Sequence, residues 1–236
     1  MVEELINYFE NFINPNRLKL VDSNLQKRTK YITIVLEDIF QPHNSAAIMR
    51  TCDCFGIQDV HIIENKNKFK PNEEIALGSD QWLNIYRYNS EKENTVDALK
   101  KLKSNNYRIV ATTSHEKGTR IEKFNINNGK AAFVFGTELT GITKSVENFA
   151  DEFVYIPMAG FTESFNISVA VAIILHQVSN KLKESNINWH LEKEDMETIR
   201  LQWLKNSIKK PDLIEKYFFE NINKNPKIKS SVTKPD

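Results

Sequence analysis

Residues 156–175 read IPMAGFTESFNISVAVAIIL, and this stretch indicates the fold more clearly than any other. It predicts an apolar strand over Phe153–Met158, then a polar loop containing glycine, then a helix from Ile167 that is apolar on almost every side. Such a helix must be buried, so the core is expected to hold the polar junction rigidly. The junction fits two interpretations: a site for a small polar ligand, as in α/β proteins, or a helix cap supplied by Ser164 or Asn166.

Strands alternate with helices over most of the chain. Strands are expected at Tyr31–Leu36, Asp59–Ile63, within 83–88, at Tyr107–Thr112 and at Lys130–Phe135. Helices are expected at Pro42–Phe55, Glu91–Asn106 and from about Thr143 to Phe149. This alternation predicts an α/β fold, with a parallel sheet covered by helices on both faces.

The ends of the chain read differently from this centre. Residues 1–30 are interpreted as a helical extension, with an amphipathic helix at Val2–Ile13 followed by a polar connector. The α/β domain is expected at 31–180, and a second helical extension at 181–220 includes an amphipathic helix over Glu192–Lys210. Residues 221–236 are rich in Asn, Lys, Ser and Pro and are expected to be disordered.

Composition excludes several classes of protein. Of the 236 residues, 40% are hydrophobic and 27% charged, and no apolar run is long enough to span a membrane. The acidic start MVEELINYFE lacks the features of a signal peptide, so we expect a cytoplasmic protein without a membrane partner. Cys52 and Cys54 would point to opposite faces of a helix, and the histidines show no ligand spacing, so no metal site is expected.

Charge is unevenly distributed along the chain. Residues 200–236 carry nine basic and four acidic side chains, whereas residues 31–199 carry 18 basic and 23 acidic ones. A basic segment beside a slightly acidic body indicates that a polyanion docks near the C-terminal end. A solvated Lys-rich tail without a partner explains the same pattern equally well.

A second corner between a strand and a helix reads FVFGTELTGIT, residues 133–143. No Lys-Ser/Thr pair follows Gly141, so it is not a P-loop, and the pattern is not the G-x-G-x-x-G of a nicotinamide-dependent oxidoreductase. Gly136 allows a backbone geometry closed to other residues. Without further context, Glu138 is interpreted as an acid stabilised by the start of the next helix.

The remaining corner, the earliest in the chain, leads into the helix at Pro42–Phe55, whose start is marked by Asn44 or Ser45 and whose end is marked by Gly56. Arg50 lies mid-helix. It fits either a surface ion pair with Asp53 or a clamp for phosphate or ribose, because a guanidinium presents a planar fork of donors. The spacing alone favours the ion pair.

Taken together, the three corners resemble the motifs of the SpoU branch of the SPOUT RNA methyltransferases. The first motif has the form N-x-x-A-x-x-R-x-x-x-x-x-G and is matched by Asn44, Ala47, Arg50 and Gly56. The second is matched by Gly136, Thr137, Glu138 and Gly141. The third, I-P-M-x-G followed by S-L-N-V-S-V-A, is matched over 156–170, except that Phe165 replaces the usual Leu.

The resemblance implies an α/β domain with a deep C-terminal trefoil knot, S-adenosylmethionine as the cofactor, and a homodimer. It assigns catalytic roles to Arg50, Glu138 and Asn166. Cofactor-binding roles go to Thr112, Gly136, Ile156, Met158, Gly160 and Phe165. RNA-binding roles go to Asn44, Arg50, Lys205, Lys209 and Lys210.

The same resemblance narrows the substrate. GSDQW at 78–82, the C-terminal segment IRLQWLKNSIKK, and only about 30 residues before the first motif favour methylation of a guanosine ribose in the D-loop of tRNA, at G18. The alternatives are a 23S rRNA ribose 2′-O-methyltransferase and a catalytically silent RNA-binding relative. A guanidinium stays protonated in proteins and so cannot act as a general base. Arg50 is therefore expected to orient the 2′-hydroxyl through a neighbouring phosphate.

Overall fold

The structure is a computed structural model that describes residues 1–70, 73–114, 118–137 and 140–224. The chain forms two compact units. We name residues 29–189 the sheet unit, and residues 1–28 with 190–236 the helical unit. Residues 225–236 of the tail expected to be disordered lie outside the described residues, and the expectation was wrong for 221–224, which form the last turn of a helix.

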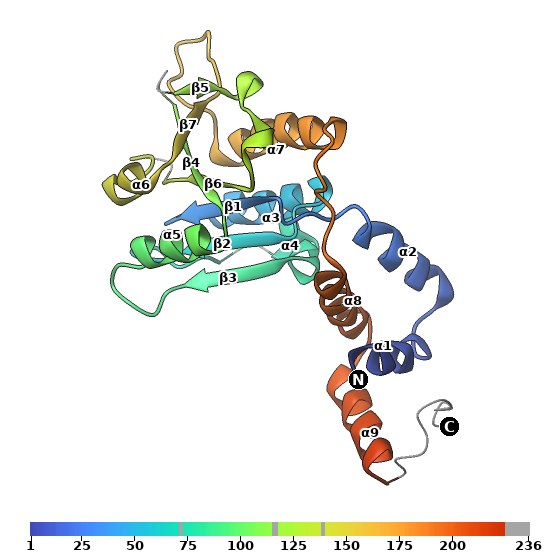
Figure 1. Cartoon of the computed structure of the whole chain (residues 1–236). Helices are drawn as coiled ribbons and strands as arrows, with labels where there is room; N and C mark the ends of the chain where they lie inside the picture. Colours follow the sequence, from blue (N-terminus) through green and yellow to red (C-terminus); the bar gives the residue numbers. More distant parts are fainter. Residues whose placement is uncertain (71–72, 115–117, 138–139, 225–236) are drawn as a thin grey trace. The chain divides into compact units, whose positions relative to one another are not determined.

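The sheet unit is built on one parallel sheet (Figure 1), which confirms the predicted α/β fold class. Within the described residues, seven strands lie in the order β3-β2-β1-β6-β4-β7-β5. Every residue of the central strands β1 and β6 is buried, as expected of strands covered on both faces. The bounds are β1 Ile32–Glu37, β2 Asp59–Ile63, β3 Asn84–Tyr88, β4 Arg108–Thr113, β5 Thr119–Arg120, β6 Ala131–Phe135 and β7 Glu152–Tyr155.

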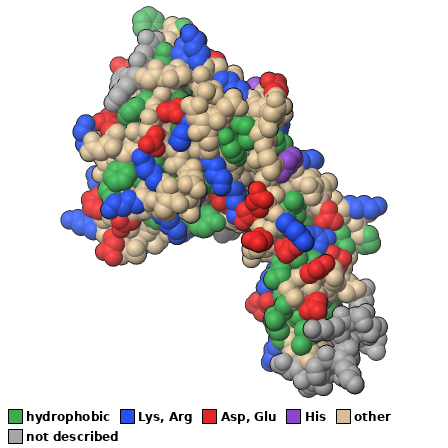
Figure 2. Space-filling view, in the orientation of Figure 1, with side chains coloured by type: hydrophobic (Ala, Val, Ile, Leu, Met, Phe, Trp, Pro, Cys, Tyr) green, Lys and Arg blue, Asp and Glu red, His purple; other side chains and the backbone are tan. Residues whose placement is uncertain are grey.

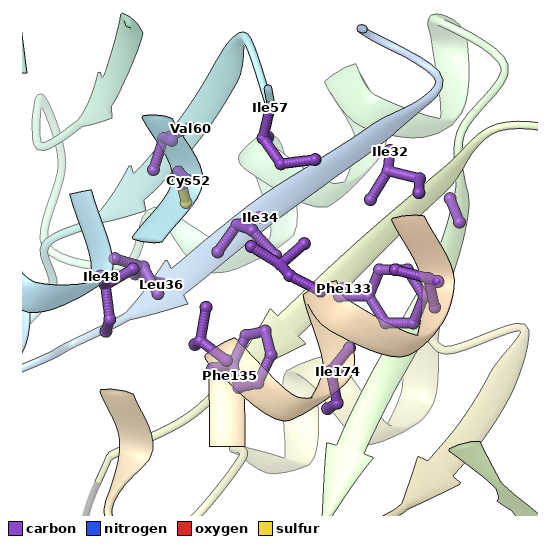
Figure 3. Packing of buried hydrophobic residues seen from close by; sticks show 14 of the residues in the cluster. Ile32, Ile34, Leu36, Ile48, Cys52, Ile57, Val60, Phe133, Phe135 and Ile174 are labelled. Atoms are coloured by element: carbon purple, nitrogen blue, oxygen red, sulfur yellow. The ribbon is translucent and has the colours of Figure 1, made fainter. Parts of the chain in front are cut away.

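Helices cover both faces of the sheet. On one face, α3 (Pro42–Phe55) and α7 (Ile167–Glu184) pack on the even-numbered residues of β1. Figure 3 shows this packing, with Ile174 of α7 beside Phe133 and Phe135 of β6. On the other face lie α5 (Thr95–Ser104) and α6 (Lys144–Phe149). Shorter helical turns are α4 (Glu73–Ala76), η1 (Ser79–Trp82), η2 (Ile121–Lys123) and η3 (Ile126–Asn128).

The strand order creates a switch point between β1 and β6. The chain leaves β1 through α3 toward β2 and β3, whereas it leaves β6 through α6 toward β7 at the other end of the sheet. The two connections diverge over opposite faces. In open parallel sheets, ligands bind at the carboxyl ends of the strands at such a point.

Two helices bear out the sequence analysis with corrections. α3 has the predicted bounds and ends at Gly56 in a left-handed conformation, φ 79°. Its start differs: Gln41 occupies the cap position, with Pro42 fixing the first turn. α7 begins at Ile167 as predicted, but Val169 is 44% exposed, so the helix is not buried on every side.

The helical unit consists of α1 (Val2–Glu10), α2 (Pro15–Leu25), α8 (Lys193–Asn206) and α9 (Pro211–Lys224). α2 replaces the expected polar connector because Asn14 caps it, accepting from the Asn16 N–H at 2.8 Å, and Pro15 opens it. Arg200 of α8 binds Glu10 of α1 at 2.6 Å and Asp22 of α2 at 2.8 Å. Ion pairs as well as apolar packing therefore organise this unit.

Membrane-spanning helices and metal-binding clusters were searched for among the described residues only. None of the helices that the structure describes is long and apolar enough to cross a membrane. In the same residues, no three His, Cys, Asp or Glu side chains lie where they could hold a metal ion.

His61 of β2 is a buried titratable group on the face covered by α5. Its ring stacks on Tyr86 with centroids 4.8 Å apart, and its Nδ1 lies 2.9 Å from the Tyr88 hydroxyl. Burial, with a smaller effect of the Lys101 charge, lowers the pKa of His61 to about 4. Burial also raises the pKa of Tyr88 to about 12, so both side chains of this hydrogen bond are uncharged near neutral pH.

This pair predicts a pH-dependent stability. Between pH 6.5 and 4 the unfolded chain protonates His61 and the folded chain does not, so the free energy of unfolding decreases as the pH is lowered, by up to about 1.4 kcal/mol per unit from this group. A double variant, His61→Phe with Tyr88→Phe, removes that slope. Urea unfolding of both proteins from pH 6.5 to 4.5 measures the difference, and a difference that stays constant with pH would contradict the assignment.

Candidate functional site

The three corners singled out in the sequence lie at one edge of the sheet. They follow β1, β6 and β7, and because all the strands are parallel their carboxyl ends share that edge. We call them the first corner (38–44), the second corner (136–143) and the third corner (156–166). Residues 156–166 lie outside helix and strand, so their backbone groups are not committed to the sheet.

The first and third corners meet through two asparagines. The side-chain amide of Asn166 donates to Oδ1 of Asn44 at 3.0 Å. The Asn166 Oδ1 accepts from the backbone N–H and the hydroxyl of Ser168, at 2.9 and 2.6 Å. Asn166 therefore caps α7 with its oxygen, which confirms the cap interpretation, and holds α3 with its nitrogen.

Arg50 is exposed on α3, six residues beyond Asn44. The expected surface pair with Asp53 does not form, and within the described residues no ion pair holds the guanidinium. A guanidinium that is exposed in this way can bind an anionic group of a substrate.

The second corner is closed by its own backbone. The amides of Thr137 and Gly141 each donate to the carbonyl of the other at 3.0 Å. A Cβ atom at Gly136 would overlap the Gly141 carbonyl, so only glycine fits there. Gly141 has φ 67°, in the left-handed region. Glu138, expected to be catalytic, lies outside the described residues.

The last residue of β1, Glu37, ties the second corner to the sheet. Its fully buried carboxylate accepts from the Thr143 backbone N–H at 3.1 Å, the Thr143 hydroxyl at 2.8 Å and the Thr95 hydroxyl at 2.6 Å. Sequence analysis did not identify Glu37. The signal for it was an acid ending an apolar strand, YITIVLE, where β-strand patterning favours another apolar residue.

A second acid, Asp38, anchors the loop after β2. Its Oδ1 accepts from the backbone N–H groups of Asn65, Lys66 and Asn67 at 2.7, 2.8 and 3.3 Å. Asp38 adopts φ 54°, a conformation that Asp tolerates better than most residues. Consecutive acids at the end of β1 thus hold the loops on either side of it.

The cofactor-binding residues expected from the resemblance fall at this edge with different exposures. The Thr112 hydroxyl donates to the Val134 carbonyl at 2.9 Å, so its proton is used within the sheet. Ile156 and Met158 are half-buried, whereas Gly160 and Phe165 are exposed. The third corner therefore offers backbone groups and an exposed aromatic ring.

The expected RNA-binding lysines lie in the helical unit. Lys205 bonds both carboxylate oxygens of Glu215 at 2.8 Å and lies over the Phe9 ring, so its charge is already paired. Lys209 and Lys210 are exposed after the end of α8. Lys209 and Lys210 therefore remain the candidate RNA-binding residues of the helical unit.

The closed second corner gives a stability prediction. Gly136→Ala should lower the free energy of unfolding by about 1–3 kcal/mol, because the corner must open to admit the methyl group. Gly160→Ala is the matched control: its Cβ would lie 4.0 Å from the Thr162 nitrogen, and the expected change is within about 0.5 kcal/mol. Urea unfolding measures both, and equal effects would refute the account of the corner.

Comparison with known proteins agrees with this geometry. A family model described as the SpoU rRNA methylase family matches residues 31–176. The tRNA (guanosine(18)-2′-O)-methyltransferase of Borreliella burgdorferi is 42% identical over 210 residues, which cover 89% of this chain and 94% of the relative. The enzyme of the same name from Aquifex aeolicus is 29% identical over 197 residues, covering 82% and 91%.

Solved structures show the same architecture. The crystal structure of the A. aeolicus TrmH/SpoU tRNA modifying enzyme matches with a TM-score of 0.73 and 30% identity, over 82% of this chain and 98% of that one. The SpoU methyltransferase AviRb from Streptomyces viridochromogenes, solved with the cofactor AdoMet, matches in fold with a TM-score of 0.58 and 19% identity, over 69% and 65%. Since the family model spans more than half of its length, this chain belongs to the SpoU rRNA methylase family, whose members are methyltransferases.

Proposed function

We propose that the protein transfers a methyl group from S-adenosylmethionine to the ribose 2′-hydroxyl of guanosine 18 in the D-loop of tRNA. The observation that carries the proposal is the hydrogen bond between Asn166 and Asn44, which joins the third corner to α3, the helix that also carries the exposed Arg50. The substrate follows from the relative in Borreliella burgdorferi, which is similar over 89% of this chain and carries that activity in its name.

The residues at the sheet edge fit S-adenosylmethionine. The third corner leaves backbone N–H and C=O groups free of helix and strand, and Gly160 has open space where a side chain would stand. Gly136 admits no side chain, which leaves backbone as the inner wall of the second corner. We propose that Gly136, Ile156, Met158 and Gly160 hold the cofactor mainly through backbone, with Phe165 against it.

The bound cofactor supplies a methyl group on a positively charged sulfur. The chain must then align an acceptor oxygen with that methyl group and allow its proton to leave. We assign the alignment to Arg50, which would bind the phosphate next to the target ribose with its planar fork. Asn166 fixes the third corner and presents its side chain to the acceptor. The catalytic role of Glu138 stays a prediction.

The RNA contacts are proposed to extend to the helical unit. Lys209 and Lys210 follow α8 and are exposed, and Lys210 has φ 74°, so its backbone turns sharply. On the face drawn in Figure 2, Lys and Arg side chains are interspersed with Asp and Glu. Such a surface favours discrete phosphate contacts rather than one broad basic patch.

The trefoil knot, the dimer and the cytoplasmic location are proposed from the family resemblance. A feature that supports the dimer is the exposed apolar side chains of the third corner and the start of α7: Phe161 is fully exposed, Phe165 is 42% exposed and Val169 of α7 is 44% exposed. Exposed apolar groups of this kind mark interaction sites. A second copy of the chain that covered them would complete the cofactor site from the other side.

The decisive experiment measures 2′-O-methylguanosine directly. Purified wild-type protein with S-adenosylmethionine and an unmodified tRNA transcript should yield this nucleoside at position 18, identified by mass spectrometry of nuclease digests. Ribosomal RNA from the same strain serves as the competing substrate. Methylation of 23S rRNA alone would overturn the tRNA assignment, and methylation of neither RNA would overturn the proposed function.

Arg50→Lys tests the orienting role. It keeps the charge but loses the fork of donors, so kcat on tRNA should fall by at least about tenfold, the equivalent of one charged hydrogen bond. Binding of S-adenosylmethionine, measured by calorimetry, should stay unchanged. Turnover within about threefold of wild type would rule out an orienting fork, since so small a change is less than one such bond.

The phosphate contacts can be tested by salt dependence. Lys209→Gln with Lys210→Asn, which tolerates a positive φ, should weaken tRNA binding and reduce the slope of log K against log[salt] by about 0.7–0.9 for each phosphate that the variant no longer neutralises. Lys193→Gln, at the opposite end of α8, is the control and should leave the slope as in wild type. An unchanged slope in the double variant would remove these lysines from the interface.

A further inference from the structure

Glu37 joins two corners that are distant in sequence. Its carboxylate ends β1, one residue before the first corner, and binds Thr143, the last residue of the second corner, across 106 positions of the chain. The Thr143 hydroxyl, while donating to Glu37, also accepts from the Val146 N–H at 3.4 Å as the cap of α6. The carboxylate therefore fixes where α6 begins relative to the end of β1.

A buried carboxylate at this position is unfavourable for the stability of the fold, which indicates that it has another role. Its three donors among the described residues are the neutral groups of Thr95 and Thr143, and the side chain is fully buried. Burying a charge among neutral donors is less favourable than filling the same volume with an apolar side chain. What the carboxylate adds is specific geometry. Its two oxygens bind Thr95 and Thr143 and so fix where α5 and α6 begin.

The position of Thr143 determines the backbone position of the rest of the second corner. Gly141 lies two residues before it and exchanges both backbone hydrogen bonds with Thr137. Gly136 in turn is packed against Gly141 without room for a methyl group. A shift of Thr143 would therefore displace the backbone at Gly136, which has no free space to absorb it.

We propose that Glu37 is a positioning residue for methyl transfer: it sets the second corner, which holds the cofactor, against the first corner, which includes Asn44 and leads to Arg50. This inference rests on the proposed function. Glu37 itself contacts neither the cofactor nor the RNA and acts through Thr143. Its bond to Thr95, at the start of α5, is not part of the second corner.

The test compares three single variants of the full-length protein. Thr143→Val removes the hydroxyl that faces Glu37, and Thr143→Ser keeps it. Thr95→Val removes a hydroxyl from the same carboxylate oxygen on the α5 side and is the control. Each Val variant also removes one acceptor, for the Asn65 side-chain amide in Thr95→Val and for the Val146 N–H in Thr143→Val. For each protein we would measure the affinity for S-adenosylmethionine by calorimetry, KM and kcat on tRNA, and the thermal midpoint.

Positioning predicts a pattern that stability alone does not. Thr143→Val should weaken S-adenosylmethionine binding by about tenfold or more, the equivalent of one buried hydrogen bond, with KM for tRNA unchanged. Thr143→Ser should restore the affinity. Thr95→Val should lower the thermal midpoint as much as Thr143→Val yet leave the affinity within about threefold, less than one such bond.

A ligand-free readout accompanies the binding data. In the protein alone, hydrogen exchange at the amides of Thr137 and Gly141 should be faster in Thr143→Val and unchanged in Thr143→Ser and Thr95→Val, because only the first loosens the corner. Equal losses of affinity in the two Val variants, or an unchanged affinity in Thr143→Val, would overturn the positioning role while wild type still binds. No binding by wild type would instead overturn the proposed function, and the inference with it.

Discussion

A single buried carboxylate organises the edge of the sheet at which the SpoU motifs lie. Glu37 sits where the two halves of the sheet diverge, between β1 and β6, and neutral hydroxyl and amide donors on both flanking helices satisfy it. Asp38 next to it holds the loop after β2 by accepting from three successive amides. The loops that follow parallel strands can adopt many conformations, and the hydrogen bonds of these two acids restrict the loops after β1, β2 and β6. The corners that bear the SpoU motifs are thereby arranged before any ligand arrives, which is what preorganisation of a site requires.

The sequence predicted what local rules determine. α3 has the predicted bounds because Gly56 adopts the left-handed conformation that ends a helix, and the central strands were recognised from their uninterrupted apolar runs. Two kinds of feature were not predicted: contacts between residues that are far apart in the chain, and a helix whose cap was not recognised. Glu37 and Thr143 are 106 positions apart, so no window of sequence could pair them. α2 was taken for a connector because its polar surface hid the cap supplied by Asn14.

The candidate site was reached by resemblance more than by periodicity. Spacing alone favoured an Arg50–Asp53 pair and left Asn166 as a possible helix cap, and only the combined motifs gave these residues roles. The structure then separated the two cases. Arg50 is exposed without that pair, whereas Asn166 is a cap and also a link to Asn44. Because one amide side chain carries both an acceptor and a donor, Asn166 can cap one helix and hold another at the same time, which a motif alone does not reveal.

The place of β6 in the sheet has a consequence for how the protein is made. Residues 131–135 form the strand between β1 and β4, although both of those precede it in the chain. During synthesis β1 and β4 emerge before β6. If they paired with each other, they would occupy the strand edges with which β6 must pair. Their edges stay open until about a hundred further residues after β1 have been added. Assembly of the sheet is thus dominated by contacts between distant segments, which makes folding slow and leaves unpaired strand edges exposed to other chains in the meantime.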